Sequence, residues 1–230
     1  MTKFKFLLFI AVLVGFAALA HAGFDEGKAA YDRGDYAKAY KEFKTLAEQG
    51  NARARCFLGL MYHDGEGVPQ DYAEATKWFR KAAEQGDADA QGILGLMYFD
   101  GKGLPKDYAE AAKWYRRAAE QGYALAQYNL GFMYHNGQGV PKNDTEAAKW
   151  YRKAANQGDA NAQHNLGLMC TKGEGVPQDF VLAHMWFNLA AAQGNAAAQK
   201  GRDLVAEHMT PSQIEEAQRL AREWKPKGRD

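Results

Sequence analysis

Residues 87–122 read DADAQGILGLMYFDGKGLPKDYAEAAKWYRRAAEQG, and this stretch of 36 residues recurs along the chain with few changes. Its landmarks keep the same 36-residue spacing in every copy, namely Trp78, Trp114, Trp150 and Trp186, and Pro69, Pro105, Pro141 and Pro177. A period of this length without a strand pattern is typical of helical repeats that stack on one another. The sequence therefore predicts an all-α fold, a right-handed α-solenoid of helix-turn-helix units.

Each unit is predicted to contain two helices joined by a glycine-rich loop. Residues 87–99 carry apolar residues at i, i+4, i+7 and i+8, which is the spacing of one buried helical face. The loop GKGLPK then ends this helix, because glycine favours left-handed backbone and proline favours an extended residue before it. Asp107 and Glu110 predict a capping box at the start of the second helix, which continues to Gly122.

The repeated pattern A-x-x-x-L-G-x-M-Y-x-x-G-x-G-V-P-x-D-Y-x-x-A-x-x-W-[FY]-x-x-A-A-x-Q-G resembles the SEL-one-like repeat family, whose members are related to tetratricopeptide repeats. Four copies fill residues 51–194 without an insertion, at 51–86, 87–122, 123–158 and 159–194. Residues 23–50 resemble a shorter, tetratricopeptide-like hairpin. Residues 195–230 are expected to form C-terminal capping helices and a tail, because the last repeat must cover its apolar face.

The first 22 residues have the composition of a signal peptide. Lys3 and Lys5 precede an apolar run, and Ala20-His21-Ala22 offers the small residues of a cleavage site. The apolar run is short for a membrane span. We therefore expect cleavage after Ala22 and a periplasmic or secreted protein that does not insert into the membrane.

Charge and cysteine usage narrow the classes of partner. The chain has 29 Lys and Arg residues against 28 Asp and Glu residues, so we expect no nucleic-acid partner. A basic band on the second helices, including Lys113, Arg116 and Arg117, predicts either a weak contact with an anionic glycan or lipid headgroup or a solvated face with ion pairs. Cys56 and Cys170 lie three repeats apart, roughly 30 Å at about 8–10 Å per packed helix, so two free thiols are predicted.

Catalytic patterns are scarce. Ser212 is the single serine, and no HExxH, CxxC, GxSxG or P-loop pattern occurs. His135 and His164 could approach each other, but two imidazoles without a carboxylate or thiol make a weak metal site, and hydrogen bonding is the alternative role. Some members of the resembled family are described as binding or hydrolysing β-lactams, and they carry paired cysteines that this chain lacks. We expect no enzymatic activity, no metal and no cofactor.

The third copy differs from the others on one face of its first helix. Leu125, Tyr128 and Phe132 lie on that face, and the resemblance implies that first helices line a concave surface. Such a stripe is typical of a protein-binding hot spot, although Tyr128 could instead fill space beside Gly92. The predicted partner-binding residues are Phe99, Leu125, Tyr128, Asn129, Phe132, His135, His164 and Asn165.

These observations favour a monomeric, non-catalytic scaffold, inhibitor or adaptor that binds another protein or peptide of the bacterial cell envelope through its concave surface. Two alternatives stay open from the sequence. One is an enzyme or sensor that acts on β-lactams or peptidoglycan fragments. The other is a secreted factor that binds host proteins.

Overall fold

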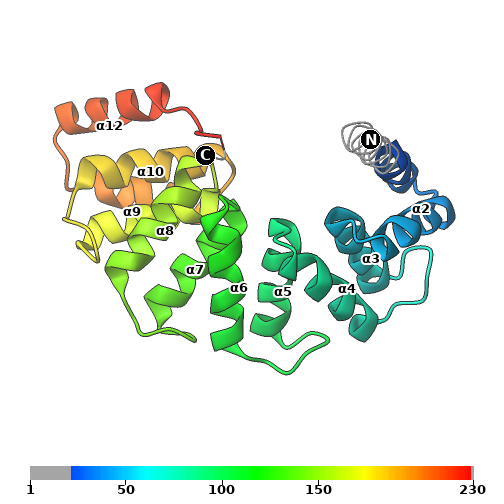
Figure 1. Cartoon of the computed structure of the whole chain (residues 1–230). Helices are drawn as coiled ribbons and strands as arrows, with labels where there is room; N and C mark the ends of the chain where they lie inside the picture. The colour runs from blue at the N-terminus through cyan, green and yellow to red at the C-terminus, as the bar shows by residue number, and fades with distance from the viewer. Residues whose placement is uncertain (1–21, 229–230) are drawn as a thin grey trace, which may run out of the picture. The chain divides into compact units, whose positions relative to one another are not determined.

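The computed structural model describes residues 22–228, and this part of the chain is helical without any strand (Figure 1). The predicted all-α solenoid is confirmed. Residues 22–32 are helical, and the helices that follow are α2 (Tyr36–Glu48), α3 (Ala52–Asp64), α4 (Tyr72–Glu84), α5 (Ala88–Asp100), α6 (Tyr108–Glu120), α7 (Ala124–Asn136), α8 (Asp144–Asn156), α9 (Ala160–Lys172), α10 (Phe180–Ala192), α11 (Ala196–Ala206) and α12 (Pro211–Glu223). The predicted signal peptide lies outside the described residues except for Ala22, the last residue of its cleavage motif.

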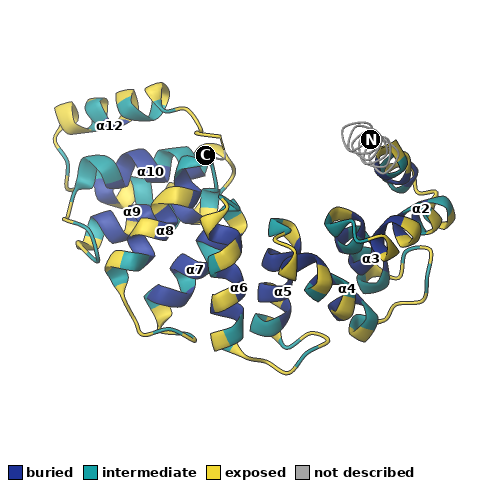
Figure 2. Ribbon diagram, in the orientation of Figure 1, coloured by how far each residue is buried: buried dark blue, intermediate teal, exposed yellow. Residues whose placement is uncertain are grey.

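The chain divides into two compact units, and the division falls within α5. Unit 1 contains the described residues up to Leu94 together with residues 102–105, and unit 2 contains residues 95–101 and the chain from Lys106 onward. In unit 1, the ring of Phe43 stacks on that of Phe57 with centroids 4.9 Å apart. In unit 2 the buried residues line the contacts between neighbouring helices, as the dark blue segments of Figure 2 show.

Short polar side chains start most of these helices, as the sequence suggests. The Asp107 carboxylate accepts hydrogen bonds from the backbone N–H groups of Ala109 and Glu110, at 2.9 and 3.0 Å. The predicted capping box is nevertheless only half formed there, because the Asp107 N–H donates to the Tyr98 carbonyl and the Glu110 carboxylate pairs with Lys113. A complete capping box, between Thr210 and Gln213, starts the C-terminal helix α12, which packs against α10.

Each hairpin closes on a contact between a glycine of its first helix and an aromatic ring of its second helix. A Cβ atom placed on Gly131 would lie 2.8 Å from the Tyr151 ring, closer than real Cβ atoms approach. The same contact recurs between Gly59 and Phe79, Gly95 and Tyr115, and Gly167 and Phe187. Glycine is required at this position because only a bare Cα lets the two helices approach so closely.

We predict that Gly131→Ala lowers the free energy of unfolding by about 1–3 kcal/mol, because the added methyl group overpacks the contact with Tyr151. Alanine in a helix interior normally stabilises relative to glycine by about 1 kcal/mol, so the sign of the change is diagnostic. Urea denaturation measures it. Lys149→Ala, at an exposed position of α8, is the control and should change stability by less than about 0.5 kcal/mol. A Gly131→Ala protein as stable as the parent would contradict this account.

Candidate functional site

The exposed large apolar side chains of the described chain lie on first helices of the repeats and on α11, which follows the last repeat in the first-helix register. They are Leu96, Leu125, Leu168 and Leu204, which keep between 37% and 62% of their surface exposed. Leu96, Leu168 and Leu204 occupy the same position of successive first helices in unit 2, and half-buried Phe132 occupies it in α7. We call Leu96, Phe132, Leu168 and Leu204 the apolar line.

Aromatic side chains of the predicted site pack next to this line. The Phe99 ring meets the Phe132 ring edge-on with centroids 6.3 Å apart, and it also contacts Tyr108 at 5.1 Å. Leu125, one of the predicted residues, is exposed on the same helix as Phe132, and Asn129 is half-buried between them in sequence. The structure therefore brings Phe99 of α5 and Phe132 of α7 together, and Leu125 lies on α7 with Phe132.

Tyr128 is half-buried and takes part in packing between repeats. Its ring centroid lies 5.8 Å from that of Tyr151, and the Asn165 side chain lies near the hydroxyl groups of both tyrosines. Burial raises the pKa of Tyr128 and of Tyr151, so both remain neutral phenols at physiological pH. The predicted role of Tyr128 in partner binding stays a prediction, because these contacts serve the fold as well.

A hollow of about 150 Å³ opens between α7, α8 and α9. Its wall includes the predicted residues Phe132, His135 and Asn165. Leu168 and Lys172 also line it, and sequence reasoning did not select them. Leu168 and Leu204 could have been found from the sequence, because they follow Phe132 at intervals of 36 residues. This spacing continues past the last full copy of the repeated pattern.

His135 and His164, the two histidines considered as a weak metal site, have different partners. His135 Nδ1 lies 2.8 Å from the Asp144 carboxylate at the start of α8. The His164 ring instead packs on Phe187, with centroids 5.6 Å apart, and its Nδ1 is buried without a hydrogen-bond partner. Within residues 22–228 no group of three His, Cys, Asp or Glu side chains could hold a metal ion.

The helix that carries the predicted stripe begins without a side-chain cap. Tyr123 stands at the N-cap of α7 and makes no capping hydrogen bond, whereas Asn51 and Asp159 cap the equivalent helices. Such a cap typically contributes about 1 kcal/mol to stability. A loss of this size at one repeat is consistent with selection for something other than stability there.

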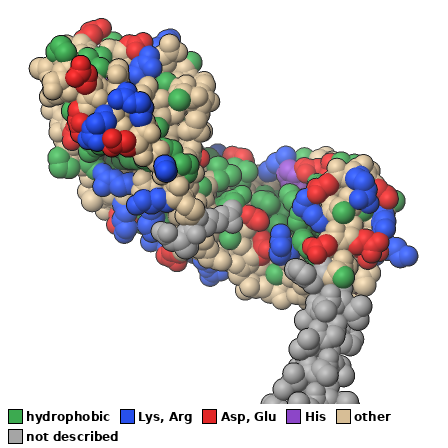
Figure 3. Space-filling model, turned by 90° about the horizontal axis from the view of Figure 1, so that it is seen from above, with side chains coloured by type: hydrophobic (Ala, Val, Ile, Leu, Met, Phe, Trp, Pro, Cys, Tyr) green, Lys and Arg blue, Asp and Glu red, His purple; other side chains and the backbone are tan. Residues whose placement is uncertain are grey.

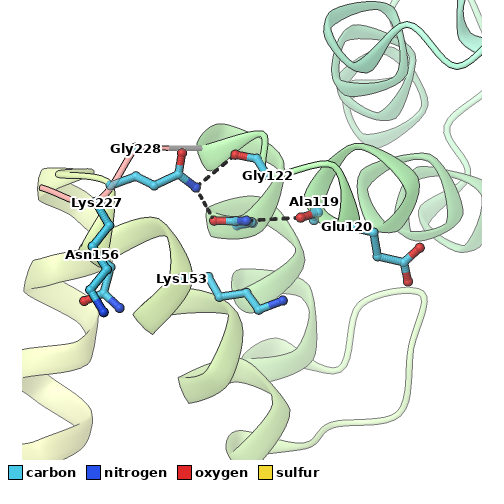
Figure 4. A pocket seen from close by; sticks show the side chains of 9 residues that line it. Ala119, Glu120, Gly122, Lys153, Asn156, Lys227 and Gly228 are labelled. Carbon is cyan, nitrogen blue, oxygen red and sulfur yellow. Dashed lines mark hydrogen bonds between the residues drawn. The ribbon is translucent and has the colours of Figure 1, made fainter. Parts of the chain in front are cut away.

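Glutamine side chains connect the repeats, which sequence reasoning missed. Gln157 donates from Nε2 to the Gly122 carbonyl at 2.9 Å and to Gln127 Oε1 at 2.8 Å, and Gln127 donates to the Ala119 carbonyl at 3.1 Å (Figure 4). Gln193, Gln163 and the Ala155 carbonyl repeat most of this arrangement one unit later. The recurrence of both glutamines at intervals of 36 residues could have indicated this role from the sequence.

The C-terminal tail lies beside these glutamines. The Lys227 N–H donates to the carbonyl of Asn156, the last residue of α8, at 2.8 Å. Together with Lys153 and Gln157, these residues line a hollow of about 190 Å³. The tail thus satisfies one of the carbonyls that a helix C-terminus leaves unpaired.

The basic side chains of the second helices have partners within the protein. Lys113 pairs with Glu110 at 2.5 Å, Arg117 lies 4.5 Å from the centre of the Trp114 ring, and Arg116 donates to the Tyr134 hydroxyl. Blue and red side chains are interspersed on the face shown in Figure 3. These contacts fit the solvated face with ion pairs, and contact with a glycan stays a prediction.

The two cysteines are buried free thiols, as predicted. Burial raises the pKa of the Cys170 thiol to about 11 and raises that of Cys56 as well. Both are therefore protonated at neutral pH and poor nucleophiles. Among residues 22–228, no helix is long and apolar enough to cross a membrane.

Stacked hairpins with an apolar face on their first helices define a helical-repeat protein, and comparison with known proteins specifies the family. The Sel1 repeat family matches residues 52–87, 88–123, 124–159 and 160–195. The chain belongs to this family.

Solved structures agree with this assignment. A protective antigen of uropathogenic Escherichia coli with an SLR fold is 39% identical with a TM-score of 0.79, covering 90% of this chain and 46% of its own length. A Sel1 repeat protein from Oxalobacter formigenes is 34% identical with a TM-score of 0.73, covering 84% of this chain and 83% of its own. The immunity protein Pa5087 from Pseudomonas aeruginosa shares the fold at 21% identity and a TM-score of 0.51, covering 92% and 84%. No curated protein matches the chain.

Family membership sets the coarse function. Sel1 repeat proteins generally bind protein partners, and they are typically scaffolds without catalytic activity. This agrees with the class of function that the sequence favours.

We predict that stability falls as the pH drops below about 6.5, because burial lowers the pKa values of His164 and His184 from their usual 6.5. The histidines of the unfolded chain keep the higher pKa and so take up protons before those of the folded chain. Acid therefore favours the unfolded state, and stability is regained as the pH rises. Urea denaturation between about pH 7.5 and about pH 5.5 measures the effect. His164→Asn should flatten the profile, whereas a parent protein with equal stability across this range would contradict the prediction.

Proposed function

We propose that the chain is a non-catalytic scaffold, inhibitor or adaptor of the bacterial cell envelope that binds a partner protein through the first-helix face of unit 2. The observation that carries this proposal is the concentration of exposed leucines on first helices, next to a hollow lined by Phe132 and Leu168. Apolar side chains grouped on a surface mark interaction sites. The second helices carry a charged, ion-paired surface instead.

The chemistry of the described residues favours binding over catalysis. The two thiols are buried and protonated, and Ser212 lies exposed on α12 in a hollow that is lined by Glu215, Glu216, Arg219 and Arg222. Neither arrangement provides an activated nucleophile with an adjacent base. A cell-wall enzyme therefore has less support than a binding protein.

The proposed location is outside the cytoplasm. The relative from uropathogenic Escherichia coli is a protective antigen, a property that favours exposure at the cell surface or release from the cell, although this chain spans only 46% of that relative. Phe24, just after the proposed cleavage site, is buried against Phe43 with ring centroids 5.7 Å apart. Phe24 of the proposed mature chain thus belongs to the packed core.

We predict that protein isolated from the cell envelope begins at Gly23. Cleavage after Ala22 leaves Phe24 in place and so should not reduce stability. N-terminal sequencing or intact mass measurement of the envelope fraction tests this. Full-length chain with Met1 retained, found in the cytoplasm, would exclude the proposed location.

The function is tested by affinity capture from envelope extract, with the mature chain as bait. We expect a captured protein that is lost when Leu125→Asp and Leu168→Asp are combined, because a buried carboxylate at the interface is costly. Lys149→Asp, which adds the same side chain on a second helix, should retain the captured protein. Equal capture by all three baits would show that the partner does not use the first-helix face.

The same captured partner tests Tyr128. Tyr128→Ala should weaken binding by more than about 1 kcal/mol if the ring belongs to the interface. Trp150→Ala, at a buried position, should lower the free energy of unfolding by about 3–5 kcal/mol in any case. A folded Tyr128→Ala protein with full affinity would restrict the site to the apolar line and the hollow.

A further inference from the structure

We infer that residues 224–228 form a salt-sensitive strap that connects the successive repeats 87–122, 123–158 and 159–194, and that release of the strap loosens the backbone where these repeats meet. All the residues that carry this inference belong to unit 2. The inference goes beyond the proposed function, because it concerns the stack of repeats itself and needs no partner.

The end of the chain reaches three successive repeats. Helix α12 packs against α10, the second helix of repeat 159–194. The ring of Trp224 comes within 3.9 Å of the position that a Cβ atom on Gly158 would take. Lys227 donates its N–H to the end of α8, and Gly228 lines the same hollow as Gly122 (Figure 4). We call the turns at Gly122 and Gly158, which end two of these repeats, the two corners.

A proline explains why the segment leaves α12. The ring of Pro226 disfavours helical backbone in Lys225 before it, and Trp224 already has extended angles, with φ −64° and ψ 137°. Residues 225–228 are all exposed. The segment therefore runs over the surface of unit 2, where contacts at the corners hold it.

The strap meets the stack where the glutamine contacts between repeats are incomplete. At one corner, Gln157 donates to the carbonyl of Gly122 at 2.9 Å. The equivalent Gln193 donates at 3.5 Å to a carbonyl of its own helix instead of to Gly158. Trp224 contacts this second corner. The strap thus supplies a connection at the corner that the glutamine leaves open.

Charge favours docking of the strap beside the hollow of about 190 Å³. This hollow lies at the C-terminal ends of α6 and α8, where helix carbonyls carry partial negative charge. The strap brings Lys225 and Lys227, and Glu120 lines the hollow. Lys153, also in the wall, lies 4.5 Å from the centre of the Trp150 ring. Attraction between exposed charges weakens as salt rises, so the strap is held less firmly at high salt.

The test is hydrogen–deuterium exchange of the mature chain at about 0.01 M salt, measured by mass spectrometry, which reports local opening of the backbone. Lys227→Pro removes the N–H donor and is compatible with an extended segment. We expect exchange in peptides that cover the two corners to rise about two- to tenfold, the factor that corresponds to losing one hydrogen bond. Peptides of α2, in unit 1, should exchange as in the parent.

The matched control is Lys227→Gln, which keeps the N–H and removes only the charge. It should raise exchange at the corners less than Lys227→Pro does. Raising the salt concentration to about 1 M shortens the Debye length from about 30 Å to about 3 Å. The corners of the parent should then exchange faster relative to α2, whereas those of Lys227→Pro should change little.

Three results would overturn the inference. The first is unchanged exchange at the corners in Lys227→Pro. The second is an increase of the same size in α2, which would show general destabilisation. The third is a parent whose corners exchange alike at both salt concentrations. None of these results depends on the capture of an envelope protein, so the strap and the proposed function can fail independently.

Discussion

The contact between a glycine of the first helix and an aromatic ring of the second is the constraint on which each repeat depends. At Gly131 and Tyr151 the two helices lie so close that no side chain fits between them. This close approach buries one apolar face of each helix within the hairpin, and the other apolar side chains pack against the next repeat. The residues that the packing leaves exposed on the first helices include the apolar line, which recurs from repeat to repeat, and Leu125, which distinguishes the third repeat.

The glutamine side chains add hydrogen bonds to this apolar packing. Gln127 is buried with its amide bonded to a carbonyl of the preceding helix and to Gln157 of its own repeat. Hydrogen bonds have directions and apolar contacts do not, so these amides fix the register between helices where the stripes alone would allow them to slide. With the register fixed, a residue such as Tyr123 can replace a capping side chain without disturbing the stack.

The sequence predicts the fold well because its period and its glycines are determined by local geometry. The helices, their caps and the complete capping box at Thr210 follow from residues that interact within a few positions of one another. Leu168 and Leu204 were not selected as site residues, because periodicity shows that they are apolar but not which side of a helix its neighbours leave uncovered. The contact of His135 with Asp144 was missed for a related reason, since a loop of several residues separates the two in sequence.

The glutamine contacts also make each repeat interchangeable at its two boundaries. Repeat 123–158 carries both Gln127 and Gln157, which bond to each other and reach back to the Ala119 and Gly122 carbonyls of the preceding repeat. A gene segment encoding 36 residues can therefore be duplicated or lost, and the junction restores the same hydrogen bonds without any compensating substitution. The length of the recognition surface can thus change in whole steps during evolution, while the identity of the residues on it changes independently.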